Sequence, residues 1–425
     1  MLTSCTMTGK CHQKKPNPTW ILLLTLILLL LFSSSVFSNE IPISISGNTR
    51  TKTSYIEDIV KDYLQKWNIK KADEIDTDQL KDIILNKEIF SEVKVDTRDS
   101  QIHIKVKDRW TLIPIPMIVA ETDQDTTYGL FVMESNFLGY GKRMMLGTML
   151  SASQTSFLLM YDDSELFFTD WRFKTLIMKR QQISYLYKGE DKIYGDDRDS
   201  SIVSFSLGYA FSDKLEGFMA LGGEQHTFET LEDYDTPEDY STIQGSITLE
   251  WDSTNYRFYY REGFMAQVSM SQQLTRSDDN ENIHDLSLQI NEEVNLFAKQ
   301  VCQLQVIAGY LGGRDERSSF RVGGEKGFRG IPDGGAWVDE LLTASLDYQV
   351  PLWFGGAGTW TVAPFLDVGY LHQPDLGEED VTYAAYGLGT YMYLKEVAVP
   401  GIGFQIGHND TYQTSFFKFT IGFSF

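Results

Sequence analysis

Apolar and polar residues alternate in short segments along the last three-quarters of the chain, from about residue 109 to residue 425. In the clearest segment Val203, Phe205 and Leu207 are separated by Ser204 and Ser206. Successive side chains of a strand point to opposite faces, so each segment has one apolar and one polar face. The pattern predicts a mainly β fold, a 16-stranded antiparallel transmembrane β-barrel with lipid outside and water inside. Its segments begin near residues 111, 126, 142, 155, 171, 201, 216, 241, 264, 284, 301, 341, 359, 384, 398 and 412.

The connections between these segments differ in length. Those after odd-numbered segments are mostly long and several are rich in Asp and Glu, whereas those after even-numbered segments, such as 212–215 and 297–300, are mostly shorter. Long loops at the cell surface and short periplasmic turns are typical of outer-membrane barrels, and an even strand count places both chain ends in the periplasm. The long connections are expected at 188–200, 227–240, 276–282, 312–340 and 372–382.

Residues 39–108 predict a small α+β domain with the order β-α-α-β-β. After one alternating strand, apolar residues recur at helical spacing. A second helix follows, which Thr77 or Asp78 can cap, and then two alternating strands lie on either side of a polar turn at 98–100. A sheet covered on one face by two helices is a complete domain. Its expected apolar residues are Ile41, Ile43, Ile45, Ile56, Val60, Tyr63, Leu64, Trp67, Leu80, Ile83, Ile84, Val93, Val95, Ile102, Ile104 and Val106.

The first 38 residues read as a signal peptide, with three lysines, the apolar run 21–32 and small residues before position 39. The alternative is a permanent membrane helix, although this run is short for one. Cleavage leaves Cys302 as the last cysteine, which excludes a disulfide within the mature chain. No later segment is apolar enough for a helical span. A closed barrel is then the remaining way to cross a membrane.

Composition and motifs argue against several other functions. The formal net charge of −22 falls to −25 without the signal peptide, and such acidity argues against nucleic acid as a partner. The six histidines are scattered without metal-ligand spacing, and no common nucleophile or phosphate-binding motif occurs. The acidic cluster 232–239 lacks the spacing of a calcium loop and fits a solvated loop better. We therefore expect no enzyme activity, no cofactor and no metal.

Two carboxylates are expected to point into the barrel. In the thirteenth segment Leu366 and Val368 face lipid, so Asp367 between them faces inward. In the twelfth segment the same alternation turns Asp347 inward. An arginine near both would form a charge-assisted, bidentate anchor.

Several motifs resemble the BamA/TamA outer-membrane assembly superfamily over essentially the whole mature chain. The connection 312–340 carries Gly323, Gly324, Phe328, Arg329 and Gly330, which resembles the superfamily's sixth-loop motif, although F-R-G-I stands where V-R-G-F or V-R-G-Y is usual. Weaker likenesses occur at 136–142 and at 251–263, where Thr254 replaces an Asp. Residues 43–52 and 89–95 resemble a POTRA domain; an unrelated α+β domain is the alternative.

The resemblance implies a single-POTRA member whose sixth loop folds into the lumen. Its Arg329 would then meet Asp367, with Asp347 nearby; the alternative is a solvated loop and an aspartate that lines a water-filled pore. The resemblance also implies that the alternating last strand, with Phe423 and Phe425, is the C-terminal signal for barrel insertion, rather than an ordinary hydrophobic strand. Pro114 and Pro116 remove ladder donors, so they indicate either a weak seam or the linker before the barrel.

The resemblance further implies a role in inserting client proteins into the outer membrane, or in moving them across it. A porin-like channel or passive surface protein is the alternative, and lipid handling at the seam is a third possibility. The expected partners are outer-membrane lipids and client proteins.

Overall fold

The computed structural model describes most of the 425-residue chain. The predicted signal peptide at 1–38 and the terminal residues Phe423 and Phe425 lie outside the described part. In the described part, no helix is long and apolar enough to cross a membrane. The described residues are 41–87, 89–122, 124–188, 191–231, 234–256, 259–277, 283–297, 299–313, 319–355, 358–374, 379–394 and 400–422.

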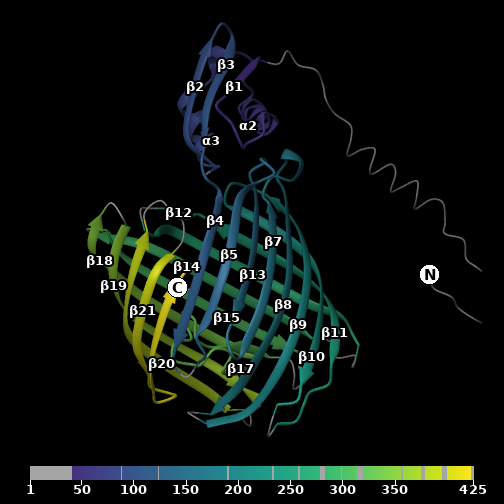
Figure 1. The fold of residues 1–425 in the computed structure, drawn as a ribbon, viewed down its shortest axis with the longest axis vertical. Coiled ribbons are helices and arrows are strands. Elements are labelled where there is room, and N and C mark those ends of the chain that lie inside the picture. Colours follow the sequence, from purple (N-terminus) through teal and green to yellow (C-terminus); the bar gives the residue numbers. More distant parts are fainter. Residues whose placement is uncertain are drawn as a thin grey trace, which may run out of the picture.

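Sixteen antiparallel strands form a closed barrel (Figure 1), as the alternating pattern predicted. Each strand pairs with its neighbours along the chain, and a two-residue strand, β12 (Asn255–Tyr256), pairs only with the start of the ninth. The sixteen strands are β4 (Leu112–Glu121), β5 (Thr127–Phe137), β6 (Lys142–Leu150), β7 (Gln154–Asp163), β8 (Trp171–Lys188), β9 (Asp191–Ala210), β10 (Leu215–Glu229), β11 (Tyr240–Asp252), β13 (Arg261–Arg276), β14 (His284–Phe297), β15 (Gln300–Gly312), β18 (Glu340–Gly355), β19 (Gly358–Gln373), β20 (Glu379–Leu394), β21 (Pro400–Asn409) and β22 (Thr414–Ile421).

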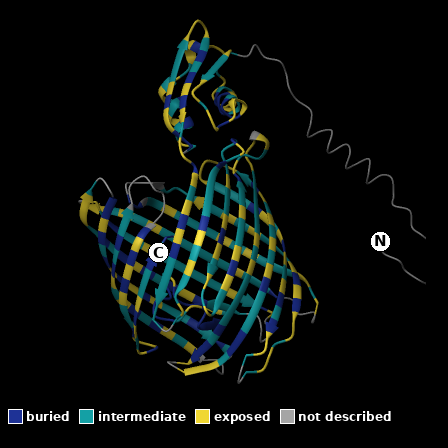
Figure 2. Ribbon diagram, in the orientation of Figure 1, coloured by how far each residue is buried: buried dark blue, intermediate teal, exposed yellow. Residues whose placement is uncertain are grey.

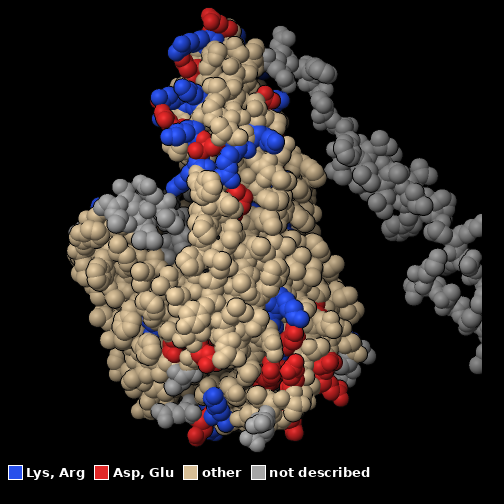
Figure 3. Space-filling view, viewed as in Figure 1, with Lys and Arg blue, Asp and Glu red and all other residues tan. Residues whose placement is uncertain are grey.

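The two faces of the barrel wall differ as the two-residue period requires. Exposed and less exposed residues alternate along the strands (Figure 2). Phe205 and Leu207 are exposed on the outside, whereas Ser204 and Ser206 are half-buried. Figure 3 shows the consequence for charge: Lys and Arg gather on the small domain, Asp and Glu gather at the opposite end, and the belt between them carries few charges.

Two predicted connections are wrong. Residues 188–200 are mostly strand rather than loop, because β9 begins at Asp191 and pairs with β8 up to Lys188. The connection 372–382 is also shorter than expected, because β19 ends at Gln373 and β20 begins at Glu379. Backbone pairing needs no apolar face, so polar strand ends escape a pattern search. The other strands begin within three residues of the predicted positions.

The small domain (residues 41–108) consists of β1 (Ile43–Ser46), α2 (Thr53–Lys66), the 3₁₀ turn η1 (Ala72–Glu74), α3 (Thr77–Leu85), β2 (Phe90–Arg98) and β3 (Gln101–Asp108). Its sheet has the order β1-β3-β2, and both helices pack on one face around buried residues such as Ile56 and Leu80. Asp76, rather than Thr77 or Asp78, caps α3. Trp67, expected in the apolar stripe, is 54 % exposed because it follows the end of α2.

The small domain rests on one end of the barrel, here called the domain end; the opposite end is the far end (Figure 1). Lys52 N–H donates to Gly139 O at 2.9 Å, and Asn136 Nδ2 donates to Thr51 Oγ1, also at 2.9 Å. Thr51 Oγ1 donates in turn to Asp108 Oδ1 at 2.6 Å. Burial alone would raise the pKa of Asp108, but hydrogen bonds from Thr51 and from neighbouring backbone amides lower it. This network fastens the domain to the turn between β5 and β6.

The described seam between the first and last strands is short. Among the described residues, 118–121 of β4 pair with 418–421 of β22, and Thr122 N–H also donates to Phe417 O, whereas β21 and β22 pair over eight residues. Pro114 and Pro116 lie inside β4 and not in a linker before it. In the part of the chain that the structure describes, four ladder pairs therefore close the barrel.

Candidate functional site: a strap inside the barrel

Residues 319–339 connect β15 to β18 and run inside the barrel; we call this segment the strap. It contains two short paired strands, β16 (Phe320–Val322) and β17 (Ala336–Val338). Between them the strap turns through Gly323 and Gly324, both at positive φ. A Cβ at Gly323 would lie 1.8 Å from Pro332 O, so this close approach of backbone to backbone requires glycine.

Arg329 lies at the centre of the strap and is 3 % exposed. Its two terminal nitrogens donate to the two oxygens of Asp347, each at 2.9 Å. Nη1 also donates to Asp367 Oδ1 at 3.2 Å. Asp347 and Asp367 are 4 % and 0 % exposed. We call this arrangement the first clasp: it joins the strap to β18 and β19.

The first clasp is balanced in charge and in hydrogen bonding. Lys326 Nζ lies 2.9 Å from Asp347 Oδ2, so two cations face two carboxylates. Asp367 also accepts hydrogen bonds from Ser345 Oγ at 2.6 Å and from the backbone N–H of Gly327 at 3.1 Å. Burial alone would lower the pKa of Arg329, but the two carboxylates raise it above its ordinary value. The guanidinium therefore stays charged.

Comparison of the chain with known protein families gives a match. Residues 136–425, more than two-thirds of the chain, match the Omp85 superfamily domain. The chain belongs to the Omp85 superfamily. Members of this superfamily are transport and assembly proteins rather than enzymes, and this Omp85 chain is an outer-membrane β-barrel of that type. A comparison with curated proteins finds no match.

Solved structures share the fold at low sequence identity. BamA from Haemophilus ducreyi lacking POTRA domains 1–3 is 14 % identical with a TM-score of 0.64, over 91 % of this chain and 85 % of that one. CdiB from Acinetobacter baumannii is 11 % identical with a TM-score of 0.60, over 90 % and 73 %. CdiB from Escherichia coli is 10 % identical with a TM-score of 0.58, over 93 % of each chain.

The strap of this Omp85 protein also reaches the last two strands. Asn409 Nδ2 donates to Arg329 O, and Thr414 Oγ1 donates to Gly330 O, both at 3.2 Å. Gly330 has φ +77°, and a Cβ there would lie 2.7 Å from the ring of Phe416. The backbone of the strap is thus fitted against β21 and β22.

Lys418 joins the strap to the seam. From β22 it donates to Gly324 O of the strap. The same ammonium group lies 3.4 Å from Glu121 on β4. One lysine therefore contacts both the strap and β4, at the shortest pairing that the structure describes between neighbours among the sixteen strands of this Omp85 barrel.

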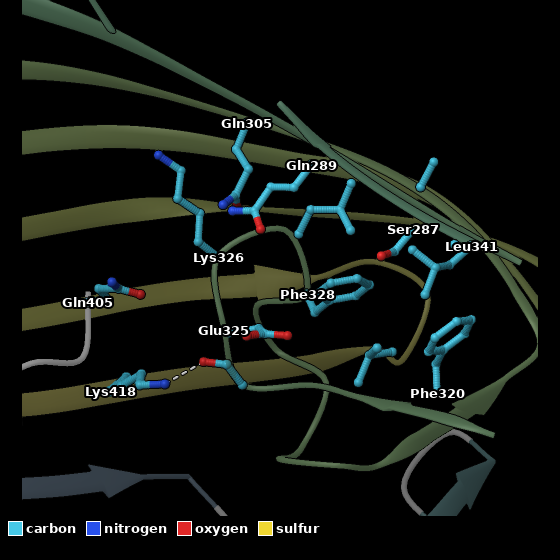
Figure 4. Close-up of a pocket in the computed structure, with 15 residues that line it drawn as sticks. Ser287, Gln289, Gln305, Phe320, Glu325, Lys326, Phe328, Leu341, Gln405 and Lys418 are labelled. Atoms are coloured by element: carbon cyan, nitrogen blue, oxygen red, sulfur yellow. Dashed lines mark hydrogen bonds between the residues drawn. The ribbon is translucent and has the colours of Figure 1, made fainter. Parts of the chain in front are cut away.

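A cavity of about 560 Å³ lies between the strap and the wall (Figure 4). From the strap it is lined by Phe320 and Phe328 together with Glu325 and Lys326. The wall side is mixed: Ile307 and Leu341 are apolar, and the other wall residues labelled in the figure are polar or charged. These are Ser287, Gln289, Gln305, Gln405 and Lys418.

The structure brings most of the sequence-derived candidates together. Gly323, Gly324, Phe328, Arg329 and Gly330 lie on the strap, with Asp347 and Asp367 against it, while Phe423 and Phe425 lie outside the described residues. Sequence reasoning did not find Lys326, Ser345, Asn409 or Lys418, because each contact joins segments far apart in the chain. It also did not find Asp196 on β9, which pairs with Arg321 of the strap and lies in the segment 188–200 that was expected to be a loop.

Proposed function

We propose that this Omp85 protein helps client proteins to insert into the outer membrane or to pass across it. The observation that supports this most is the seam, where four ladder pairs join β4 and β22 among the described residues and Lys418 of β22 contacts both Gly324 of the strap and Glu121 of β4. This is the shortest pairing that the structure describes between neighbours among the sixteen barrel strands, so the wall would open there at least cost. A client segment would enter the bilayer between β4 and β22.

The direction of the hydrogen bonds along β4 supports the same proposal. Thr122 N–H donates across the seam to Phe417 O at 3.1 Å. Donors on one edge of a strand recur every second residue, so positions 120 and 118 also face β22, and positions 116 and 114 continue the same edge of β4. These last two are Pro116 and Pro114, which have no N–H to donate. The edge of β4 thus lacks two consecutive donors beyond Ile118, the last residue that pairs with a described residue of β22.

The small domain would act as a POTRA-like periplasmic domain, at residues 39–108 after a cleaved signal peptide at 1–38. In the sheet order β1-β3-β2, strand β2 (Phe90–Arg98) is an outer strand. An outer strand offers unpaired backbone groups to which an extended chain can add. The far end with its acidic residues (Figure 3) would then lie at the cell surface.

A second candidate, a porin-like channel, is favoured by the polar wall of the cavity, which includes Gln289, Gln305 and Gln405. The two functions differ in what the seam must do. A channel conducts through the lumen with its wall closed, whereas an insertion factor has to open the wall.

The test is a reversible lock across the seam. Val119 and Thr420 face each other in a pair without backbone hydrogen bonds, where side chains lie close enough for a disulfide. Val119→Cys with Thr420→Cys, in a Cys302→Ser background, is reconstituted in liposomes and the folding rate of an added barrel protein is measured. We expect acceleration by the reduced form and none by the oxidised form, so reduction of the same sample is the matched control.

Equal acceleration by both forms would contradict the seam route. A large steady conductance without acceleration by either form would favour the channel instead.

A further inference from the structure

The strap is held at a second point, by an ion pair that the first clasp does not include. Arg321 on β16 donates from Nη1 to Asp196 Oδ1 at 2.8 Å and from Nη2 to Asp196 Oδ2 at 2.6 Å. Asp196 lies on β9 and is 2 % exposed. Arg198 Nη2 approaches the same carboxylate at 3.4 Å. We call the bidentate pair of Arg321 and Asp196 the second clasp.

Aromatic packing fixes the geometry of the second clasp. The Arg321 guanidinium lies 4.0 Å from the ring centroid of Trp337, the residue with which it pairs between β16 and β17. Trp337 is buried and its Nε1 donates to Gly334 O at 3.0 Å. Tyr194 on β9 packs edge-on against Trp337, with ring centroids 5.3 Å apart. Both partners of the ion pair are therefore held by further contacts.

The backbone adds a contact to the same part of the wall. Tyr187 N–H at the end of β8 donates to Gly335 O of the strap at 3.1 Å. In the closed order of the barrel, β9 is the sixth strand, whereas β18 and β19 are the twelfth and thirteenth. The two clasps thus attach the strap to walls on nearly opposite sides.

We propose that Asp196 and Arg321 are positioning residues that hold the strap across the lumen and keep it closed to solutes. The first clasp alone fixes the centre of the strap to one wall. The second clasp fixes the hairpin of β16 and β17 to the other wall, so loss of the ion pair removes the bidentate attachment there and leaves weaker contacts such as that of Tyr187 with Gly335. This proposal does not depend on the proposed function, because the two clasps would hold the strap across the lumen whether or not the barrel inserts client proteins.

The test measures how readily water reaches the strap. Val338 on β17 is fully buried, so Val338→Cys reports opening when the other cysteines (Cys5, Cys11 and Cys302) are replaced by serine. The folded protein in liposomes is labelled with a water-soluble maleimide, and the ion conductance is recorded on the same preparation. We expect Asp196→Asn to increase the labelling rate about tenfold or more, because it leaves the half-buried Arg321 without its ionic partner, and to raise the conductance.

Two further variants sharpen the result. Asp199→Asn is the matched control: it removes the same charge from the opposite face of β9, where the carboxylate pairs with Lys179, and it should label like the parent. Arg321→Gln combined with Asp196→Asn should label no faster than either single variant, since both remove one interaction.

Labelling of Asp196→Asn at the parent rate, in protein that still migrates as a folded barrel before heating, would overturn the proposal. If Asp196→Asn does not fold, Arg321→Gln makes the same measurement from the strap side, and labelling at the parent rate would again overturn it.

Discussion

Removal of Arg329 should destabilise the barrel through charge imbalance rather than through loss of volume. In the first clasp Arg329 and Lys326 face Asp347 and Asp367, so the buried set is neutral. Arg329→Met keeps most of the side-chain volume but leaves one uncompensated negative charge. Breaking a buried ion pair by removal of one partner costs about 3–5 kcal/mol. We expect a loss of this size in the free energy of unfolding.

A second substitution distinguishes this cause from a simple packing defect. Arg329→Met with Asp367→Asn leaves Lys326 paired with Asp347 at 2.9 Å, so the set is neutral again. Asparagine removes the second carboxylate charge and keeps one acceptor oxygen, so no buried charge is left without a partner. The double variant should therefore be more stable than Arg329→Met alone and recover at least about half of the loss.

The assay is unfolding by urea in lipid vesicles, followed by tryptophan fluorescence. The midpoint and slope give the free energy of unfolding for the parent, the single and the double variant. A double variant less stable than Arg329→Met would refute the charge argument. A loss below about 1 kcal/mol for Arg329→Met would show that the clasp is worth no more than a surface pair.

Three further predictions follow from single positions. Gly330→Ala forces a Cβ against Phe416 at φ +77° and should cost about 1–3 kcal/mol in the same unfolding assay. Pro116→Ala restores a backbone N–H donor on the seam edge of β4. A seam with this donor should open less readily, so the variant should increase the folding rate of a client in liposomes by less than the parent does. Because the pKa of Asp108 is lowered in the folded domain, its carboxylate stabilises the small domain at pH values above the ordinary carboxyl pKa. This contribution should be lost as the pH falls through the lowered pKa. The rate of proteolysis of the domain, measured against pH, reports the loss.

Each of these predictions has its own control. Gly223→Ala places a Cβ 4.0 Å from Thr242 O, an ordinary van der Waals contact, and should leave stability almost unchanged. Unchanged acceleration by Pro116→Ala would show that the missing donor does not govern the seam. Asp108→Asn should lose the pH dependence; if proteolysis of this variant still follows the parent's pH profile, another group is responsible.

The sequence by itself determined the repeating elements. A strand exposed to lipid on one face and to water on the other has to alternate, so strands such as β9 and β14 could be recognised from segments like 203–207 and 286–290. The core of the small domain followed from the same logic at helical and strand periods. The inward orientation of Asp347 and Asp367 was also determined, because the period assigns every residue to a face.

Only the tertiary structure decided which distant residues meet. Periodicity says that Asp196 and Lys418 face inward once their strands are known, but not that the strap crosses the lumen to reach both. The polar strand end 191–200 carries little apolar signal, because Asp196 contacts the strap and Asp199 pairs with Lys179, and neither contact calls for an apolar side chain. The strap itself has no period. Its path is set by glycines that permit close approach and by buried charges that need partners, and those partners lie on strands far away in the chain.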